Sequence, residues 1–414
     1  MTTLPSPIEA GAQARAVINP RAAAPAEPYG ETRSQVMSAP RFAAALAEIS
    51  SWPGYARTPL VALPGLASAL GLAQLHYKDE RGRFGLRSFK ALGGAYAVSN
   101  VLRRKVAAAK GLALDSLGSA DLLSGAHDDL IRGETVTCAT DGNHGRSVAW
   151  GARLFGCRCV IYVHETVSQG RRDAIAQYGA QVVEVKGNYD DAVRHAAQQA
   201  AANGWTVVSD TSYPGYRDIP SDVMHGYGVM AAEIGAQMAE PPTHVFVQAG
   251  VGALAAAICA DFWIRWGERR PQFVVVEPLS ADCVYRSLEK GEQVAVQGSL
   301  ETVMAGLACG EVSDLAWAIL REGANSAIAV DDRYALAGMR LFANPLAGDT
   351  PIVSGETGAS GLAALLAVRD HPALAATLKL DASSRVLLLG SEGDTDPAIY
   401  REVVGRPADA VLAA

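Results

Sequence analysis

Residues 135–163 read TVTCATDGNHGRSVAWGARLFGCRCVIYV, and this stretch decides the fold. It opens with a short apolar and β-branched run that predicts a strand, and the strand ends at a polar loop with the sequence TDGN. Residues 144–155 then place apolar side chains at helical spacing, and residues 159–163 form a second apolar run. A strand, a helix and a second strand in this order are typical of a parallel sheet covered by helices.

The same alternation continues on both sides of this stretch. Further strands are expected at residues 75–80, 181–185, 206–209, 244–248, 272–276 and 386–390. Helices are expected from residue 89 onward and at residues 168–178, 189–202, 223–238 and 253–267. We therefore predict the α/β fold class, with mostly parallel, twisted sheets that are covered by helices.

The length of the chain predicts two domains, because 414 residues are too many for one ordinary compact core. Residues 1–36, which are rich in Ala, Pro and Gly, indicate an N-terminal arm. We assign residues 37–90 and 220–414 to a larger domain and residues 91–219 to a smaller one. Within the smaller domain, residues 111–133 are expected to be an inserted segment.

Composition limits the classes of partner and compartment. The chain is 49% hydrophobic and 19% charged, as a globular enzyme would be, and its net charge of −7 argues against nucleic acid or an anionic membrane as a partner. The six cysteines lack the spacing of a zinc site, so we expect reduced thiols and no metal. Without an apolar segment of membrane-spanning length or a secretion signal, we expect a cytoplasmic protein.

Several polar residues lie where predicted strands end. Asp141, Asp210, the loop 250–253 and Ser391 each follow such a strand. In open parallel sheets, ligands bind at the carboxyl ends of the strands. This edge is therefore the expected place of a site.

Lys90 stands at the start of a predicted helix, in the run SFKALGG. A lysine there is most often a solvated side chain, but Gly93 and Gly94 indicate that another group approaches the backbone closely. A lysine amine can form a Schiff base with an aldehyde, and after release it can accept a proton.

Two loops between a strand and a helix offer backbone donors. The loop of Gly250, Val251, Gly252 and Ala253 suits a phosphate; it could also suit a dinucleotide, although it does not fit the pattern GxGxxG. The loop at 140–145 suits a carboxylate, and Asn143 could bind a ring hydroxyl of a cofactor; the alternative for this loop is an ordinary capped turn.

Two further side chains complete the candidate site. Asp210 is either a functional acid or a residue that caps a turn or helix. Ser391, with its neutral hydroxyl, could meet a pyridine nitrogen. A lysine for an aldehyde, a loop for a phosphate and donors for a substrate carboxylate together indicate pyridoxal 5'-phosphate as the cofactor.

Over roughly residues 40–405, the chain resembles the tryptophan-synthase-like class of pyridoxal-phosphate enzymes. Within that class it resembles the diaminopropionate ammonia-lyases. The match is carried by SFK with the following GG at 88–94, TDGNHGR at 140–146, residues Asp210, Thr211, Gly215, Tyr216, Ile219 and Pro220, and EGDTDP at 392–397. The last motif is the most particular to these lyases.

The resemblance implies a role for each candidate residue. Lys90 would be the Schiff-base residue and one α-proton base, Asp141 the base for the opposite enantiomer, and Asp210 a second acid near the substrate amine. The implied cofactor contacts are Phe89, Lys90, Asn143, Gly250, Val251, Gly252, Ala253 and Ser391. The implied substrate contacts are Ser88, Thr140, Asp141, Gly142, His144 and Asp210.

The resemblance also implies an activity, the removal of both amino groups from D- and L-2,3-diaminopropionate to give pyruvate and ammonia. The larger domain would bind the cofactor, the smaller would be mobile, and two copies of the chain would form a homodimer. Three alternatives stay open at this stage: a serine or threonine dehydratase, a β-replacement synthase, and a regulator that binds the cofactor without catalysis.

Overall fold

The computed structural model of the chain describes residues 4, 6, 8, 11–140 and 142–413. Contacts within the chain divide it into two compact units. The large unit consists of Met1–Ala39, Arg57–Ser88 and Met230–Ala414, and the small unit consists of Pro40–Ala56 and Phe89–Val229.

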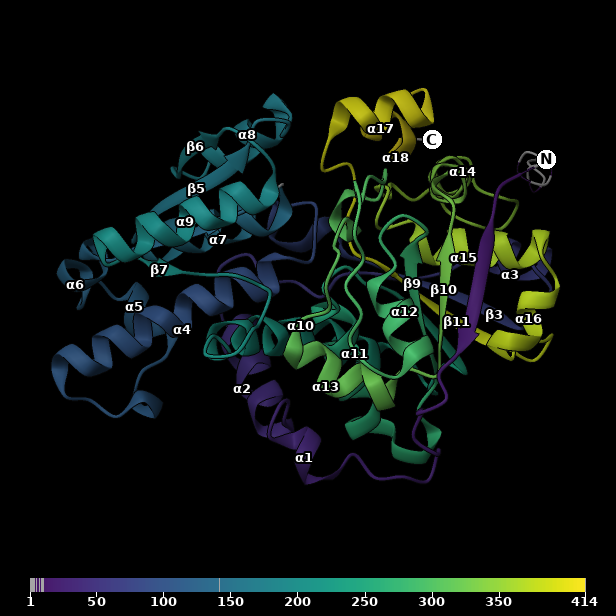
Figure 1. Ribbon diagram of the computed structural model, residues 1–414, viewed down its shortest axis with the longest axis horizontal. Helices are drawn as coiled ribbons and strands as arrows, with labels where there is room; N and C mark the ends of the chain where they lie inside the picture. Colours follow the sequence, from purple (N-terminus) through teal and green to yellow (C-terminus); the bar gives the residue numbers. More distant parts are fainter. Residues whose placement is uncertain (1–3, 5, 7, 9–10, 141, 414) are drawn as a thin grey trace. The chain divides into compact units, whose positions relative to one another are not determined.

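The large unit contains a seven-stranded sheet with the order β1-β10-β9-β8-β11-β3-β2 (Figure 1). The inner pairs are parallel, and the edge strands β1 and β2 pair antiparallel to their neighbours. Its strands are β1 (Ala14–Ile18), β2 (Leu60–Ala62), β3 (Gln74–Asp79), β8 (His244–Gln248), β9 (Gln272–Pro278), β10 (Ser326–Val330) and β11 (Arg385–Gly390).

Helices bury this sheet. Every residue of β8 and β10 is buried, as expected for parallel strands with both faces covered, and α15 packs across β8, β9, β10 and β11. The helices of the large unit are α1 (Gly30–Ser34), α3 (Pro64–Ala69), α11 (Ala253–Trp266), α12 (Cys283–Lys290), α13 (Asp314–Gly323), α14 (Asp332–Ala343), α15 (Ser360–Asp370), α16 (Ala373–Leu378), α17 (Pro397–Val404) and α18 (Ala408–Leu412), with 3-10 turns η1 (Glu80–Gly85), η3 (Gly267–Arg269) and η4 (Ala305–Leu307).

The small unit contains a parallel sheet with the order β6-β5-β4-β7, made of β4 (Thr135–Ala139), β5 (Arg158–His164), β6 (Gln181–Val185) and β7 (Thr206–Val207). Its helices include α4 (Ala91–Lys110), α7 (Asn143–Phe155), α8 (Gln169–Ala176) and α9 (Tyr189–Asn203). The helix α2 (Ala39–Ser50) lies almost wholly in this unit, and residues 111–133 form the short elements η2 (Leu114–Ser116), α5 (Ser119–Leu123) and α6 (Asp128–Gly133).

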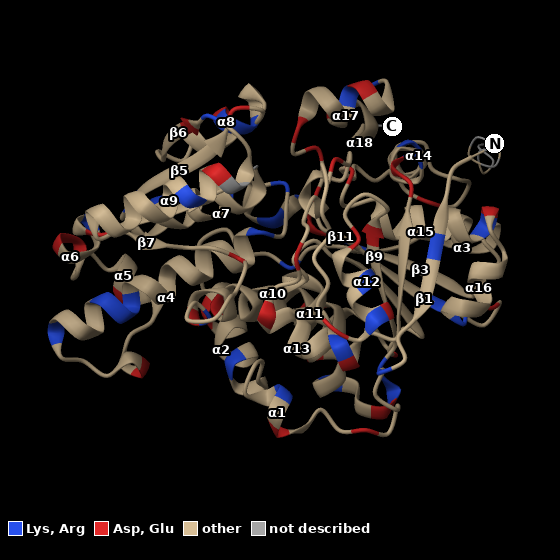
Figure 2. Cartoon of the chain, in the orientation of Figure 1, with Lys and Arg blue, Asp and Glu red and all other residues tan. Residues whose placement is uncertain are grey.

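The close packing of α4 against α7 depends on glycines. A Cβ added at Gly94 would lie 1.9 Å from the hydroxyl oxygen of Ser147, and one added at Gly151 would lie 2.7 Å from the Cα of Ala95. Figure 2 shows that the charged residues of α4 lie in its second half, so its first half is free to pack. Lys90, which directly precedes α4, and His144, in the first turn of α7, therefore lie in the same unit.

The predicted α/β fold with mostly parallel sheets is confirmed, but the expected domain boundaries differ from the two units. Residues 40–56 lie in the small unit, because Arg41 pairs with the buried Asp222 and Phe42 packs on His225. The helix α10 (Asp218–Gln237) contributes to the small unit up to Val229 and to the large unit after it.

The expected N-terminal arm is built into the large unit of its own chain over much of its length. Strand β1 pairs with β10, and the side-chain amide of Asn19 donates hydrogen bonds of 3.0 and 2.7 Å to the carbonyls of Arg321 and Ala324. The indole of Trp263 donates to the carbonyl of Glu27. Among the described residues, no helix is both long and apolar enough to cross a membrane.

Candidate active site

Lys90 and Asp210 form an ion pair in the small unit. The Lys90 Nζ lies 2.6 Å from the Asp210 Oδ2, and both side chains are mostly buried, with 21% and 16% exposed. Lys90 directly precedes α4, and Asp210 follows β7. The structure thus brings together two of the predicted catalytic residues, which are 120 positions apart in the chain.

This pairing keeps Asp210 ionised. Burial alone would raise the pKa of its carboxyl, but the ammonium of Lys90 and then the ring of His144 lower it well below its usual range. Asp210 is therefore a carboxylate that holds a cation, rather than only a cap of a turn.

His144 lies near the same oxygen of the Asp210 carboxylate as Lys90. Its Nδ1 is 3.7 Å from the Asp210 Oδ2, and its Nε2 is 2.8 Å from the carbonyl oxygen of Val208. Because a carbonyl oxygen only accepts hydrogen bonds, Nε2 carries a proton. This residue was expected to contact the substrate, and the structure shows that its ring directly neighbours a predicted catalytic acid.

The loop before α7 closes on the hydroxyl of Thr140. This oxygen accepts hydrogen bonds from the backbone N–H of Gly142 at 3.0 Å and of Gly145 at 3.2 Å. The loop is thus a capped turn, and Asn143 begins the helix. The predicted base Asp141 lies outside the described residues, so the capped turn tests neither its role nor the role of the loop as a carboxylate site.

Two aromatic rings lie near the amine of Lys90 within the small unit. Its Nζ lies 5.5 Å from the ring centroid of Phe89 and 5.8 Å from that of Tyr227, and these two rings pack 4.7 Å apart. Sequence reasoning missed Tyr227. The only signal was its place on the buried face of a predicted helix, which does not distinguish it from an ordinary core residue.

In the large unit, the glycine loop 250–253 joins β8 to α11 and has no room for larger residues. A Cβ at Gly250 would lie 2.9 Å from the carbonyl oxygen of Gly306 and 3.0 Å from the sulfur of Cys309. Gly252 has a φ of +89°, which favours glycine. Because the loop leads into the N-terminus of a 14-residue helix, its backbone N–H groups suit an anion such as a phosphate.

Ser391 lies at the end of β11, in the same unit as this loop, and accepts a hydrogen bond. The side-chain amide of Gln248 donates to the Ser391 hydroxyl at 2.6 Å and to the carbonyl oxygen of Leu389 at 2.8 Å. The carbonyl fixes the orientation of the amide, since it can only accept. Ser391 can therefore donate its own hydrogen to another acceptor, such as an unprotonated pyridine nitrogen. In the sequence, only its place before the glycine loop distinguishes Gln248 from other residues of a predicted strand.

Ser88 also lies in the large unit, where its backbone forms an antiparallel bridge with Glu392. The predicted site residues are thus divided by unit. The small unit holds Phe89, Lys90, Thr140, Gly142, Asn143, His144 and Asp210, and the large unit holds Ser88, Gly250, Val251, Gly252, Ala253 and Ser391.

Comparisons with known proteins agree over most of the chain. The family model for pyridoxal-phosphate dependent enzymes matches residues 51–391. The chain is 44% identical over 366 residues to diaminopropionate ammonia-lyase of Escherichia coli strain K12, which covers 86% of this chain and 89% of that protein.

Solved structures give the same result. A crystal structure of diaminopropionate ammonia lyase from Escherichia coli in complex with an aminoacrylate-PLP azomethine reaction intermediate has a TM-score of 0.84 and 38% identity, and covers 95% of this chain and 97% of that one. A structure of that protein with D-serine has a TM-score of 0.82 and 38% identity, and covers 97% and 99% of the two chains. The likeness therefore extends over both units.

Proposed function

Since this chain belongs to the diaminopropionate ammonia-lyases, within the family of pyridoxal-phosphate dependent enzymes, we propose that Lys90, Asp141 and Asp210 carry out its reaction. The chain is a carbon–nitrogen lyase that uses pyridoxal phosphate and converts 2,3-diaminopropionate to pyruvate and ammonia. Its fold is the tryptophan-synthase-like α/β fold. We further propose that both enantiomers are substrates and that each residue of the site has a distinct function.

The residues present fit the cofactor. The crowded glycine loop at 250–253 would hold the phosphate through backbone N–H groups, and the hydroxyl of Ser391 would donate to the ring nitrogen. Asn143 would bind the ring hydroxyl. When bound, pyridoxal phosphate accepts the negative charge that remains on the substrate Cα after its proton is removed.

Lys90 would hold the cofactor aldehyde covalently and, once substrate displaces it, take the α-proton of one enantiomer. The single observation that supports this most is its contact of 2.6 Å with Asp210. A carboxylate at that distance can hold the protonated amine of Lys90. It can also bind the β-ammonium of diaminopropionate by a charge-assisted hydrogen bond.

Asp141 would take the α-proton of the other enantiomer from the opposite face. Two bases on opposite faces of a planar reacting centre would permit turnover of both D and L substrates. Ser88, Thr140, Gly142 and His144 would contact the substrate, and the small unit would be the mobile one.

The test is release of pyruvate and ammonia by protein loaded with pyridoxal phosphate, given D- and L-diaminopropionate and D- and L-serine in parallel. We expect both diaminopropionate enantiomers to react well above serine. Lys90→Ala should lose the absorbance of bound cofactor and all activity. Asp141→Asn should reduce turnover of the D substrate more than that of the L substrate.

Each assignment can fail separately. A preference for serine would keep the cofactor but move the chain to the dehydratases, and a requirement for an added nucleophile would indicate a β-replacement synthase. An active Lys90→Ala variant would contradict the role of Lys90. Equal losses on both enantiomers in Asp141→Asn would contradict its face-specific role.

We also propose that the chain acts as a homodimer in the cytoplasm. Twofold homodimers are the commonest oligomers, and six cysteines in 414 residues do not form the pattern of a secreted disulfide framework. Light scattering should give twice the mass of the 43.2 kDa chain. A monomeric mass for the active protein would contradict the dimer.

A further inference from the structure

The backbone that leads to Lys90 is strained. Phe84 and Arg87 have φ angles of 48° and 58°, which are left-handed values that residues with a Cβ rarely adopt. Gly85 between them has a φ of 72°. Such a path persists only where the surrounding structure fixes it, and this kind of strain is concentrated at functional sites.

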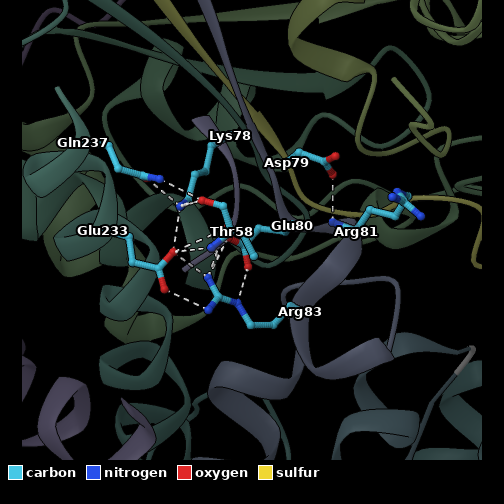
Figure 3. A network of polar contacts seen from close by, with 8 residues as sticks. All are labelled: Thr58, Lys78, Asp79, Glu80, Arg81, Arg83, Glu233 and Gln237. Carbon is cyan, nitrogen blue, oxygen red and sulfur yellow. Dashed lines mark hydrogen bonds and ion pairs between the residues drawn. The ribbon is translucent and has the colours of Figure 1, made fainter. Parts of the chain in front are cut away.

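A buried ion network fixes the beginning of this path. In Figure 3, the guanidinium of Arg83 lies between the carboxylates of Glu80 and Glu233. Arg83 Nε donates to Glu80 at 2.8 Å and its Nη1 donates to Glu233 at 2.8 Å, while Lys78 Nζ donates to Glu233 at 2.7 Å. The side chains are at most 1% exposed, so the network is sealed from water.

The loop after β11 fixes the end of the path. The Arg87 guanidinium donates to the Asp394 carboxylate at 2.7 Å and to the Asp394 carbonyl at 3.1 Å. The backbone N–H of Gly393 donates in return to the Arg87 carbonyl at 2.9 Å, and Ser88 bridges to Glu392. Only 7% of the Asp394 side chain is exposed, although 44% of Arg87 is.

The loop is itself held firmly. The backbone N–H of Gly355 donates to the Glu392 carbonyl at 3.0 Å, and that of Thr357 donates to the Glu392 carboxylate at 3.1 Å. The loop begins at Ser391, which Gln248 fixes at 2.6 Å. One short loop therefore fixes both the hydroxyl assigned to the cofactor ring nitrogen and the backbone three residues before Lys90.

We propose that Arg87 and Asp394 are positioning residues, which hold the left-handed backbone at Arg87 and thereby set the direction from which Lys90 reaches the cofactor. Neither side chain is assigned a contact with substrate or cofactor. This inference rests on the proposed role of Lys90. It also gives a physical function to part of the EGDTDP motif at 392–397, no residue of which has a role in the proposed reaction.

The test compares Arg87→Ala, Asp394→Asn and the double variant with the wild type. Arg333→Ala is the control, because it removes a half-exposed arginine that pairs with Asp331 in the same unit. The readouts are the dissociation constant for pyridoxal phosphate, the circular dichroism of the bound cofactor, and kcat and KM for diaminopropionate. Thermal unfolding shows which variants are folded.

We expect each single variant to weaken cofactor binding about tenfold and to lower kcat about tenfold, with KM within about twofold of the wild type. The double variant should lose no more than either single one, because the two residues act as a pair. Arg87→Lys should recover part of the loss in cofactor affinity and kcat. Arg87→Gly should have a higher cofactor affinity and kcat than Arg87→Ala, because glycine adopts a positive φ without strain.

Two outcomes would overturn the inference: single variants that match Arg333→Ala in cofactor binding and kcat, or losses that multiply in the double variant. Cofactor affinity and dichroism are measured without substrate. A wild type that binds the cofactor but prefers serine would therefore revise the proposed substrate and leave the test of positioning intact.

Discussion

The imidazole of His144 directly neighbours Asp210 on the side away from the carbonyl of Val208, with a distance of 3.7 Å between Nδ1 and Oδ2. Asp210 therefore has two basic neighbours, Lys90 and His144, and both lower the pKa of its carboxyl. Since the Nε2 proton of His144 is donated to a backbone carbonyl, the ring is held in one orientation.

Two substitutions of His144 should separate its effect on the Asp210 carboxylate from its hydrogen bond to the carbonyl of Val208. Both His144→Gln and His144→Phe remove the imidazole beside Asp210, so we expect each to lower kcat/KM about tenfold. Only the phenylalanine variant leaves the buried carbonyl of Val208 without a donor, which should cost about 1–3 kcal/mol of unfolding free energy. Urea unfolding and steady-state kinetics check this, and unchanged kinetics in both variants would contradict the role beside Asp210.

Asp210→Asn should change substrate preference. The substitution keeps the shape of the side chain but removes the negative charge that we assign to the β-ammonium of diaminopropionate, which D-serine lacks. We expect kcat/KM for diaminopropionate to fall at least about tenfold further than for D-serine, which corresponds to about 1.4 kcal/mol of differential transition-state binding. Equal losses on both substrates would limit Asp210 to pairing with Lys90.

Much of the fold could be predicted because its strands are short apolar runs that end in polar loops. Strands β4, β6 and β8 have the expected bounds. By contrast, β1 and β10 were not predicted, because five weakly apolar residues in an Ala-rich region give little periodicity. Their antiparallel pairing also joins segments about 300 positions apart, which no local pattern indicates.

The site could be predicted residue by residue but not as a set of contacts. The rule that strand ends face a ligand identified Asp210 and Ser391, yet their partners Lys90 and Gln248 depend on tertiary structure. The left-handed backbone at Arg87 could not be predicted at all, because an arginine gives no local sign of a positive φ.

The glycine loop can be tested with a matched pair at the two ends of α11. Gly252 and Gly267 both have positive φ, of +89° and +54°, but only Gly252 belongs to the loop assigned to phosphate. Alanine should cost about 1 kcal/mol of unfolding free energy at Gly267, where nothing lies within 4 Å of the added Cβ, and more at Gly252, where that Cβ would lie 3.0 Å from the Cβ of Ala316. Only Gly252→Ala should weaken binding of pyridoxal phosphate, by about tenfold in an absorbance titration. Equal affinities of the two variants would place the phosphate elsewhere.

Glu277 at the end of β9 predicts a pH dependence of stability. Burial raises the pKa of its carboxyl to about 8 from an ordinary value of 4.5, against the opposing effect of backbone N–H groups of Val284 and Tyr285. Between these two values the folded chain keeps a proton that the unfolded chain loses. The stabilisation from Glu277 is therefore complete below pH 4.5 and is lost as the pH rises through 8.

Glu277→Gln is neutral at every pH, so it should flatten this dependence, although its single oxygen can replace only one of the two carboxylate oxygens that accept from Val284 and Tyr285. We expect the wild type to lose up to about 1.4 kcal/mol per pH unit relative to the variant between pH 5 and 8. Urea unfolding across that range measures the difference, and Glu268→Gln, at an exposed position of the same unit, is the control. If the unfolding free energies of wild type and Glu277→Gln change in parallel with pH, Glu277 is ionised in the folded chain. The two backbone donors would then lower the pKa of its carboxyl more than burial raises it.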